Sequence, residues 1–437
     1  MIRDDQIPEL RYYRRSERQL QIESSTAYEP LVVFGSNQDE AIHNWFRFKE
    51  GFSSDLLPTF LHEFGDLLPR KDLTLLDPFC GSGTSLISAQ FSTEKQIRAI
   101  GIERNPFIHF VAQTKASWQS MNSRTLVADG VRAIVHAAEI EASLPELSGI
   151  QSGRCISQHI ARRLIAISEA ARQGRSNSDF IRLGIASAIE PLSRVRKDGR
   201  ALRIVKKPRR VIRPVLESKW QRMANDVELI SAVACRNIPE AEIHLGDGRN
   251  PAANEVEPES VDLIFTSPPY PNNIDYSEVY KLELWMLGFV ENSQQFLDLR
   301  YSTVRSHPTF DRRSILNADF MGEVEHGRLR ALLGATTKRL DESGEQWRAK
   351  MLLAYFSDLW EALQNYRQVL RPNGIAVFVI GNSLHGSQSP ALIASDIILA
   401  KMAEILGFRS QILIARGLKR RLAGNHFLRE SLVLLSR

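Results

Sequence analysis

Leu73-Thr74-Leu75-Leu76-Asp77-Pro78-Phe79-Cys80-Gly81-Ser82-Gly83-Thr84-Ser85-Leu86 is the stretch of sequence that decides the fold. An apolar run ends at an acid, a turn with two glycines follows, and helix-compatible residues come next, so the pattern predicts strand, turn and helix in that order. Gly81 and Gly83 permit a tight turn and the close approach of a ligand, and the first N–H groups of the helix would point into the same site. Because the lysine of a P-loop and the third glycine of the dinucleotide fingerprint are absent, the pattern favours neither ATP nor NAD.

Two further predicted strands place carboxylates at the same edge of a sheet. The run 97–103 ends on Glu103, about twenty residues after the glycines, where an acid can bind ribose hydroxyls. The short run 243–245 is followed by Asp247, whose carboxylate can accept a hydrogen bond from an adenine amino group. Because the carboxyl ends of successive strands lie along the crevice where such sheets bind ligands, these acids predict a nucleoside-like ligand.

A fourth predicted strand, 261–266, ends in Ser267-Pro268-Pro269-Tyr270. Two consecutive prolines donate no backbone hydrogen bonds and hold a rigid extended turn, which leaves the neighbouring carbonyls free to accept from a planar amino group. A polar acceptor, fixed carbonyls and the tyrosine ring suit the exocyclic amine of a nucleobase taken out of its stack. Pro-Pro-Tyr also occurs in proline-rich ligand motifs, but those lie in proline-dense disordered segments, whereas this one closes an apolar strand.

Together these motifs resemble the S-adenosylmethionine-dependent amino-methyltransferases that modify cytosine N4 or adenine N6 in DNA. The resemblance covers roughly residues 40–115, 240–290 and 350–437. It implies S-adenosylmethionine as cofactor and a catalytic motif made of Ser267, Pro268, Pro269 and Tyr270. The residues that it implies for cofactor binding are His43, Trp45, Asp77, Pro78, Phe79, Gly81, Gly83, Thr84, Glu103, Asn105, Asp247 and Thr266. Among these, His43 and Trp45 belong to a segment expected to close over the methionine end of the cofactor.

The fold that the resemblance implies is an α/β, seven-stranded Rossmann-like methyltransferase sheet, mostly parallel, with one antiparallel strand at the C-terminal end. Strand and helix patterns alternate along the chain, as this fold requires. A helix and the fifth strand are expected over 355–382 with a turn at 370–374, and the last two strands over 409–415 and 430–435. The predicted organisation is an N-terminal arm (1–40), a cofactor-binding part (41–115), an inserted region (116–240) and a catalytic part (241–437) with a second insertion at about 271–350.

The first insertion forms a largely helical second lobe in this prediction, and it is the candidate target-recognition region. Apolar spacing predicts helices over 133–142, 160–172, 179–188 and 220–234. Pro208 and Pro214 argue for an extended basic arm between them. The residues predicted to contact nucleic-acid phosphates are Arg194, Arg196, Lys197, Lys206, Lys207, Arg209 and Arg210, joined by Lys419 and Arg420 near the C-terminus.

The second insertion contains a stretch, 281–289, that is expected to be a packed helix, and a basic stretch, 300–313. The basic stretch is predicted either as a loop reaching DNA or as a plain surface loop. Arg11, Arg14, Arg15 and Arg18 form a basic, aromatic arm near the N-terminus to which the sequence assigns no purpose.

Composition restricts the class of protein. With 437 residues, 43% of them hydrophobic, the chain can bury a large core, and a net charge of +5 with a pI of about 9.1 permits a polyanionic partner. No apolar run of about 18 residues and no N-terminal signal region occur, so a cytoplasmic protein is expected. The cysteines, Cys80, Cys155 and Cys235, lack metal-ligand spacing, so no metal is expected, and none follows a proline, which argues against cytosine-C5 methylation.

The function expected from the resemblance is site-specific methylation of double-stranded DNA, with cytosine N4 favoured because Ser267 stands at the first motif position. Adenine N6 remains open. So do methylation of guanine N2 in RNA, methylation of a glutamine amide in a protein, and a non-catalytic nucleic-acid-binding module. A partner protein from a restriction or defence system is also left open.

Overall fold

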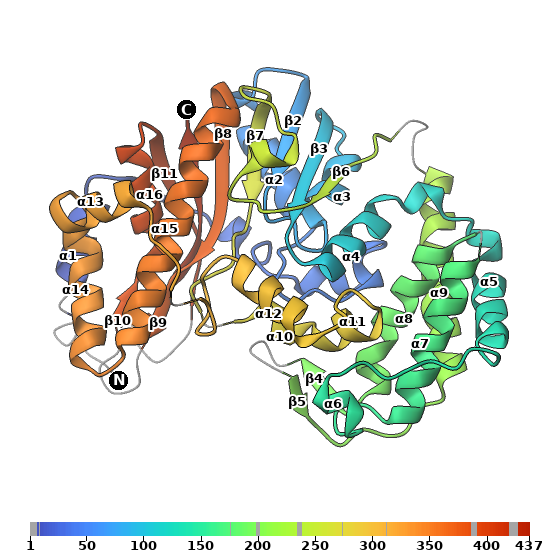
Figure 1. The fold of residues 1–437 in the computed structure, drawn as a ribbon. Helices are drawn as coiled ribbons and strands as arrows, with labels where there is room; N and C mark the ends of the chain where they lie inside the picture. Colours follow the sequence, from blue (N-terminus) through green and yellow to red (C-terminus); the bar gives the residue numbers. More distant parts are fainter. Residues whose placement is uncertain are drawn as a thin grey trace.

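The computed structural model describes residues 7, 9–174, 176–197, 202–233, 238–272, 274–311, 313–385, 391–418 and 427–437. Within these ranges a central sheet carries helices on both faces, and a helical lobe lies beside one end of the sheet (Figure 1). This α/β architecture with a mostly parallel sheet fits the predicted Rossmann-like methyltransferase fold.

The central sheet has the strand order β1-β11-β12-β8-β7-β2-β3-β6. Its strands are β1 Gln21–Ser24, β2 Asp72–Asp77, β3 Gln96–Glu103, β6 Glu242–Leu245, β7 Val261–Thr266, β8 Leu370–Gly381, β11 Arg409–Gly417 and β12 Arg429–Ser436. In the described part of this sheet, β12 runs antiparallel to both of its neighbours and the other pairings are parallel. The prediction of one antiparallel strand near the C-terminal end is therefore confirmed.

Two details of the sheet differ from the prediction. The described sheet has eight strands rather than seven, because β1 pairs with β11 inside the segment predicted as an arm. β1 is polar and mostly exposed, so no apolar run marks it in the sequence. Residues 370–374, predicted as a turn, instead begin β8, where Asn373 has a φ of 65° and the pairing with β7 shifts register.

Alternating side chains of the central strands fill two cores. Leu76 of β2 and Ile264 of β7 belong to the core shared with α15 Gln346–Val369 and α16 Ser395–Ile405. Leu75 and Leu263, one residue earlier in each strand, face the opposite core, which is shared with α2 Leu56–Phe64 and α3 Thr84–Gln90. Successive strand residues point to opposite faces, so burial on both faces explains why these strands read as continuous apolar runs.

The helical lobe is built from α5 Ser123–His136, α7 Gln158–Gln173, α8 Ser178–Leu192 and α9 Ile212–Val233. At its centre Trp220 of α9 is fully buried and donates a hydrogen bond from Nε1 to the Ile181 carbonyl (3.1 Å). A Cβ added at Gly130 of α5 would lie 2.4 Å from the Trp220 ring, and one added at Gly184 of α8 would lie 2.3 Å from it. The glycines therefore allow the helices to close on the indole.

Most of the helices predicted for this lobe are present. Residues 160–172 and 179–188 lie within α7 and α8, and the described part of 220–234 lies within α9. The prediction over 133–142 is only partly right, because α5 ends at His136. Pro214 does not hold this region in an extended arm, because it falls in the first turn of α9, where a proline costs no helix hydrogen bond.

The second insertion packs against both the helical lobe and α15. Lys281–Met286 forms helix α11 with buried apolar side chains, as expected for a packed helix. The described part of the basic stretch 300–313 does not extend as a free loop. Arg305 and His307 are buried, and Arg305 Nη2 pairs with Asp358 Oδ1 of α15 at 2.6 Å. The stretch thus forms part of the structure around the ends of the strands.

The N-terminal segment packs against the C-terminal part of the chain, where its helix contacts α14 Leu329–Glu342 and α16. Helix α1 Leu10–Glu17 buries Tyr13, whose hydroxyl donates to the Leu392 carbonyl (3.1 Å). Glu17 Oε1 accepts from Arg429 Nη1 (2.7 Å), and Arg429 is itself buried in β12. The basic side chains of α1 therefore lie on a helix that is anchored to the C-terminal part of the chain.

The remaining helices are α4 Pro106–Ala116, α6 Ser148–Gln151, α10 Tyr276–Val279, α12 Ser293–Ser302, α13 Ala318–His326 and α14 Leu329–Glu342. Short 3-10 helices span Thr26–Tyr28, Gly35–Gln38, His43–Trp45, Gly65–Leu67, Trp118–Ser120 and Pro251–Asn254. Two small antiparallel pairs join β4 Val195–Lys197 with β5 Leu202–Ile204 and β9 Ser383–His385 with β10 Ala391–Ile393. None of the described helices is both long and apolar enough to cross a lipid bilayer.

Candidate functional site

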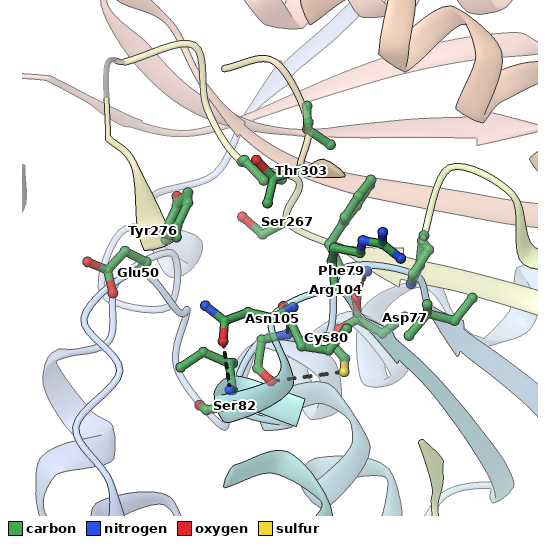
Figure 2. A pocket seen from close by; sticks show the side chains of 18 of the residues that line it. Glu50, Asp77, Phe79, Cys80, Ser82, Arg104, Asn105, Ser267, Tyr276 and Thr303 are labelled. Carbon is green, nitrogen blue, oxygen red and sulfur yellow. Dashed lines mark hydrogen bonds between the residues drawn. The ribbon is translucent and has the colours of Figure 1, made fainter. Parts of the chain in front are cut away.

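A cavity lies at the carboxyl ends of β2, β3, β6 and β7, and we call it the strand-end cavity. Its lining residues are Phe48, Glu50, Gly51, Phe52, Asp77, Pro78, Phe79, Cys80, Gly81, Ser82, Thr84, Ile102, Glu103, Arg104, Asn105, Ile108, Asp247, Gly248, Ser267, Pro269, Tyr276, Ser277, Ser302, Thr303, Val304, Ser306 and His307. Figure 2 shows side chains from these separate segments, among them Asp77, Asn105, Ser267, Tyr276 and Thr303, arranged around one space. The site therefore draws on both halves of the predicted methyltransferase domain and on the second insertion.

Asp77 ends β2 at the base of this cavity. Its Oδ1 accepts hydrogen bonds from Thr266 Oγ1 (2.7 Å) and from the Phe79 backbone N–H (3.2 Å), and its Oδ2 accepts from Ser85 Oγ. Burial raises the pKa of Asp77 to about 6, although these hydrogen bonds oppose the shift. Thr266, which does not line the cavity itself, thus holds Asp77 in place.

Glu103 ends β3 and binds the glycine turn directly. Its Oε2 accepts from the Gly81 N–H (3.0 Å), and its Oε1 accepts from the Asn105 N–H (2.8 Å). Burial raises the pKa of Glu103 to about 7. Asn105 in turn caps α4, accepting from the N–H groups of Phe107 and Ile108. Two poorly hydrated carboxylates therefore face the same cavity. A cation or hydroxyl donors bound there would stabilise their ionised forms.

The glycine turn has the backbone geometry that its sequence requires. Gly81 and Gly83 have φ values of 51° and 83°, in the left-handed region that other residues adopt at a cost. A Cβ at Gly81 would also lie 2.9 Å from the ring of Phe48. Gly81 and Thr84 line the cavity together with Pro78 and Phe79, whereas Gly83 does not.

Asp247 follows β6 and lines the cavity on the side of the second insertion. Burial would raise its pKa, but hydrogen bonds and charge from Arg249 outweigh burial and lower it. Arg249 Nη2 lies 2.6 Å from Asp247 Oδ2, and its Nη1 lies 2.7 Å from Asp358 Oδ1. Because Asp358 also binds Arg305, an ion-pair chain connects this side of the cavity to the loop that carries His307.

The Ser-Pro-Pro-Tyr motif is only partly exposed to the cavity. Ser267 and Pro269 line it, whereas Pro268 and Tyr270 do not. The ring of Tyr270 packs beside the end of β8, where a Cβ on Gly381 would lie 3.0 Å from Tyr270 Cε2. The Tyr270 hydroxyl lies 3.5 Å from Ser267 Oγ, and burial raises the pKa of this phenol. Tyr276, a few residues further on, presents its ring to the cavity (Figure 2).

His43 and Trp45 lie away from the strand-end cavity, and the cofactor contact expected for them stays a prediction. Both are buried, and Trp45 Nε1 donates to Asp226 Oδ2 of α9 (2.9 Å). Burial lowers the pKa of His43 to about 3, and the nearby Lys115 adds to this shift. The same segment does reach the site a few residues later, through Phe48, Glu50, Gly51 and Phe52.

Sequence reasoning missed several residues of the cavity lining, including Glu50, Tyr276, Thr303 and His307. Glu50 accepts a hydrogen bond from Tyr280 (2.7 Å), and burial raises its pKa. Proximity to the predicted motifs could have pointed to Glu50 and Tyr276. No sequence signal connected Thr303 or His307 with the strand ends.

The predicted phosphate contacts divide into exposed and buried groups. Arg194, Arg196, Lys206, Arg209 and Arg210 are exposed. Lys197 is buried, pairs with Glu283 at 2.6 Å and lies over the rings of Phe46 and Tyr280, so it is not available to a phosphate. Lys207 is half-buried and donates to the carbonyls of Glu190 and Val195. Lys419 and Arg420 lie outside the described residues.

The donor set of the cavity fits a nucleoside that carries a positive charge. Asp77, Glu103 and Asp247 supply acceptors for cationic and hydroxyl groups, while Phe48, Phe79 and Ile102 supply apolar contacts. Among the described residues, no group of three or more His, Cys, Asp or Glu is placed to hold a metal ion.

Fold, cavity and sequence comparison together support the methyltransferase class. A family model described as "RMKL-like, methyltransferase domain" matches residues 68–159, which include the glycine turn and Glu103. The chain is also similar to individual methyltransferases. It is 26% identical to Type II methyltransferase M.BsoBI of Geobacillus stearothermophilus, an alignment that covers 89% of this chain and 82% of that protein. It is 24% identical to Type II methyltransferase M.AvaI of Nostoc sp. and of Anabaena variabilis, covering 86% of this chain and 81% of each relative. No solved structure matches the chain.

Proposed function

We propose that this protein is a site-specific DNA methyltransferase that transfers a methyl group from S-adenosylmethionine to the exocyclic amine of a flipped base, with cytosine N4 as the preferred target. The observation that carries this proposal is the shared lining of the strand-end cavity. Asp77 and Glu103 come from the cofactor half of the chain, and Ser267 and Pro269 come from the catalytic half, yet all four line one space. The similarity to Type II methyltransferases supports DNA as the substrate.

Cofactor binding is assigned to the carboxylates that end the strands. Asp77 faces the methionine part of the cofactor, Glu103 accepts from the ribose hydroxyls, and Asp247 lies on the adenine side. Asn105 and Phe79 complete the lining around the nucleoside. When bound, S-adenosylmethionine supplies an electrophilic methyl group.

The target amine is a poor nucleophile because its lone pair is delocalised into the ring. Ser267 Oγ and the Pro268 carbonyl accept hydrogen bonds from this amine, which makes its nitrogen more tetrahedral and orients it toward the methyl donor. Tyr270 stacks on the flipped base. The proton leaves the nitrogen after the methyl group is transferred, so neither a covalent enzyme intermediate nor a metal ion is required.

The choice of cytosine rests on Ser267, since serine at the first position of this motif is more common in cytosine-N4 enzymes of the family that the sequence resembles. Adenine N6 is the alternative target for the same mechanism. The exposed basic side chains Arg194, Arg196, Lys206, Arg209 and Arg210 are assigned to the DNA backbone.

Mass spectrometry of nucleosides from the DNA of expressing cells tests this proposal, with Tyr270→Ala as the control of reduced activity. N4-methylcytosine at a clearly lower level in the control is the expected result. N6-methyladenine would keep the mechanism and reverse the base. If no modified DNA base is found while the purified protein binds S-adenosylmethionine, the DNA substrate is wrong, and RNA or protein substrates take its place.

A further inference from the structure

A hollow on the helical lobe gathers cationic side chains from separate segments, and we call it the basic hollow. Its lining includes Arg47 after the 3-10 helix His43–Trp45, Lys207 and Arg210 before α9, and Lys219 within α9. Glu190 of α8 is part of the same lining. The hollow is separate from the strand-end cavity, and Arg47 and Lys219 in its lining were not among the predicted phosphate contacts.

The charges in this hollow are unbalanced. Lys197 and Glu283 also line it, but they pair with each other, which leaves four cations against Glu190. Burial lowers the pKa of Lys219, and the charges of Arg222 and Arg210 lower it further, whereas Glu190 opposes the shift. Arg47, Arg210 and Lys219 form no ion pair with any carboxylate in the described chain. Like charges that converge without counter-charges destabilise a folded chain unless an anion lies between them.

Hydrogen bonds hold one of these cations, Lys207, in place. Lys207 Nζ donates to the carbonyls of Glu190 (2.7 Å) and Val195, which ties the segment before α9 to the end of α8. Arg210, three residues further along this segment, lines the hollow. Asn44 lines the hollow as well, and its buried side-chain oxygen has no hydrogen-bond partner in the described structure. Because the amide can be oriented either way, Asn44 could donate an N–H to an anion.

A chain of side-chain contacts connects the basic hollow with the strand-end cavity. Phe46 and Lys197 line the hollow, and the Lys197 ammonium lies 4.3 Å from the centre of the Tyr280 ring. Tyr280 in turn donates to Glu50, which lines the strand-end cavity. An anion in the hollow would therefore be held near the strand-end cavity.

We propose that the basic hollow binds one phosphodiester of the DNA backbone through Arg47, Arg210 and Lys219. This inference rests on the proposed function, because it takes duplex DNA as the source of the phosphate. Arginine suits this ligand since its planar group donates two parallel hydrogen bonds to phosphate oxygens, and the lysine adds a point charge. The contact fixes the position of the backbone and carries no sequence information.

Salt dependence of DNA binding tests the proposal. The affinity of a fluorescent duplex that contains a methylated target sequence is measured over a range of salt concentrations for the unmodified protein, Lys219→Gln, Arg47→Gln and Arg210→Gln. Each loss of a phosphate contact is expected to reduce the slope of log affinity against log salt by about 1 and to weaken binding roughly tenfold at about 0.1 M salt. The effect should be equal for target and non-target duplexes.

Arg213→Gln is the matched control, because Arg213 is on the same helix but pairs with Glu217 at 2.8 Å outside the hollow. Affinity for S-adenosylmethionine, measured by calorimetry, reports whether each variant is folded. If all three hollow variants keep the salt dependence of the unmodified protein and the protein still methylates DNA, the phosphate site is wrong, but the proposed function stands. If the unmodified protein binds S-adenosylmethionine but neither binds nor methylates duplex DNA, the proposed function fails, and the inference fails with it.

Discussion

At the scale of single residues, the ring of Tyr270 depends on a neighbouring glycine for its position. Gly381 lies so close to the ring that a methyl group there would be 3.0 Å from Tyr270 Cε2. The Tyr270 hydroxyl makes one long contact with Ser267, so the ring and not the hydroxyl is expected to matter.

Substitutions at Tyr270 can separate the contribution of the ring from that of the hydroxyl. Tyr270→Ala should reduce single-turnover methyl transfer by roughly tenfold to a hundredfold or more, since stacking on a base is worth about 1–3 kcal/mol. Tyr270→Phe should stay within about threefold of the unmodified protein. Gly381→Ala should fall between them because it displaces the ring. Full activity in Tyr270→Ala would rule out the stacking role.

The carboxylates of the cavity predict how cofactor binding depends on pH. Burial raises the pKa values of Asp77 and Glu103 to about 6 and about 7, so both are partly protonated in neutral solution before a ligand arrives. A ligand that needs the ionised forms must displace these protons. Affinity for S-adenosylmethionine should therefore fall roughly tenfold from pH 8 to pH 6, as calorimetry can measure.

The same raised pKa values have the opposite effect on folding stability, which increases as the pH falls. Because the folded state of the ligand-free protein binds these protons more tightly than the unfolded state, the contribution of the two carboxyls to stability rises as pH falls from about 7 toward 4.5. Glu103→Gln removes one titrating group and should flatten the pH dependence of binding. An affinity that increases toward pH 6 would contradict the assigned roles.

At the scale of secondary-structure elements, the helical lobe depends on close contacts around Trp220. Gly184→Ala would place a methyl group 2.3 Å from the indole nitrogen, so α8 or the ring must move. Overpacking of this kind is expected to lower the free energy of unfolding by about 1–3 kcal/mol, measured by urea denaturation.

Gly334→Ala offers a matched control in α14, where an added Cβ meets no atom within 4 Å. Alanine favours helix more than glycine does, so this change should stabilise the protein by about 0.5–1 kcal/mol. If Gly184→Ala is as stable as Gly334→Ala, the packing described for Trp220 is wrong.

The elements differ in how well their sequence predicts them. β2, β3 and β7 are apolar on both faces, and their terminal acids are visible in the sequence, so the strands and the positions of Asp77 and Glu103 could be predicted. Arg305 and Lys197 were read as exposed because charged residues usually are. Each is buried through a partner far away in sequence, Asp358 and Glu283, and no local pattern reveals such a pair.

Local sequence predicted only part of the candidate site as well. Ser267 and Pro269 could be predicted to line it, because they directly follow an apolar strand. His43 and Trp45 could not be excluded from it, since their burial against α8 and α9 depends on how the helical lobe packs. Thr303 and His307 enter the cavity through the fold of the second insertion, which carries no recognisable motif.

At the scale of the whole molecule, the N-terminal segment joins regions that are distant in sequence. β1 pairs along β11, and Glu17 binds the buried Arg429. Removal of residues 1–24 should expose the β11 edge and leave Arg429 with Asp396 as its carboxylate partner. We expect a lower midpoint of thermal unfolding and concentration-dependent aggregation, measured by scanning fluorimetry and light scattering.

Tyr13→Phe is the milder comparison for this deletion. It removes the hydroxyl hydrogen bonds to Thr336 and Leu392 while keeping the ring, and it should cost about 1 kcal/mol. A truncated protein that unfolds at the same temperature and stays monomeric would show that the segment is dispensable for the sheet.

The strand-end cavity also has a consequence for the lifetime of the protein in a cell. Its lining comes from segments that begin near residue 48 and end near residue 307, so one small molecule would connect most of the chain. Saturation at a hundred times the dissociation constant stabilises a folded protein by about 2.7 kcal/mol. In a cell with little S-adenosylmethionine, a larger fraction of this protein would lack its ligand, unfold and be degraded by proteases. The amount of the protein in the cell would then depend on the supply of methyl donor.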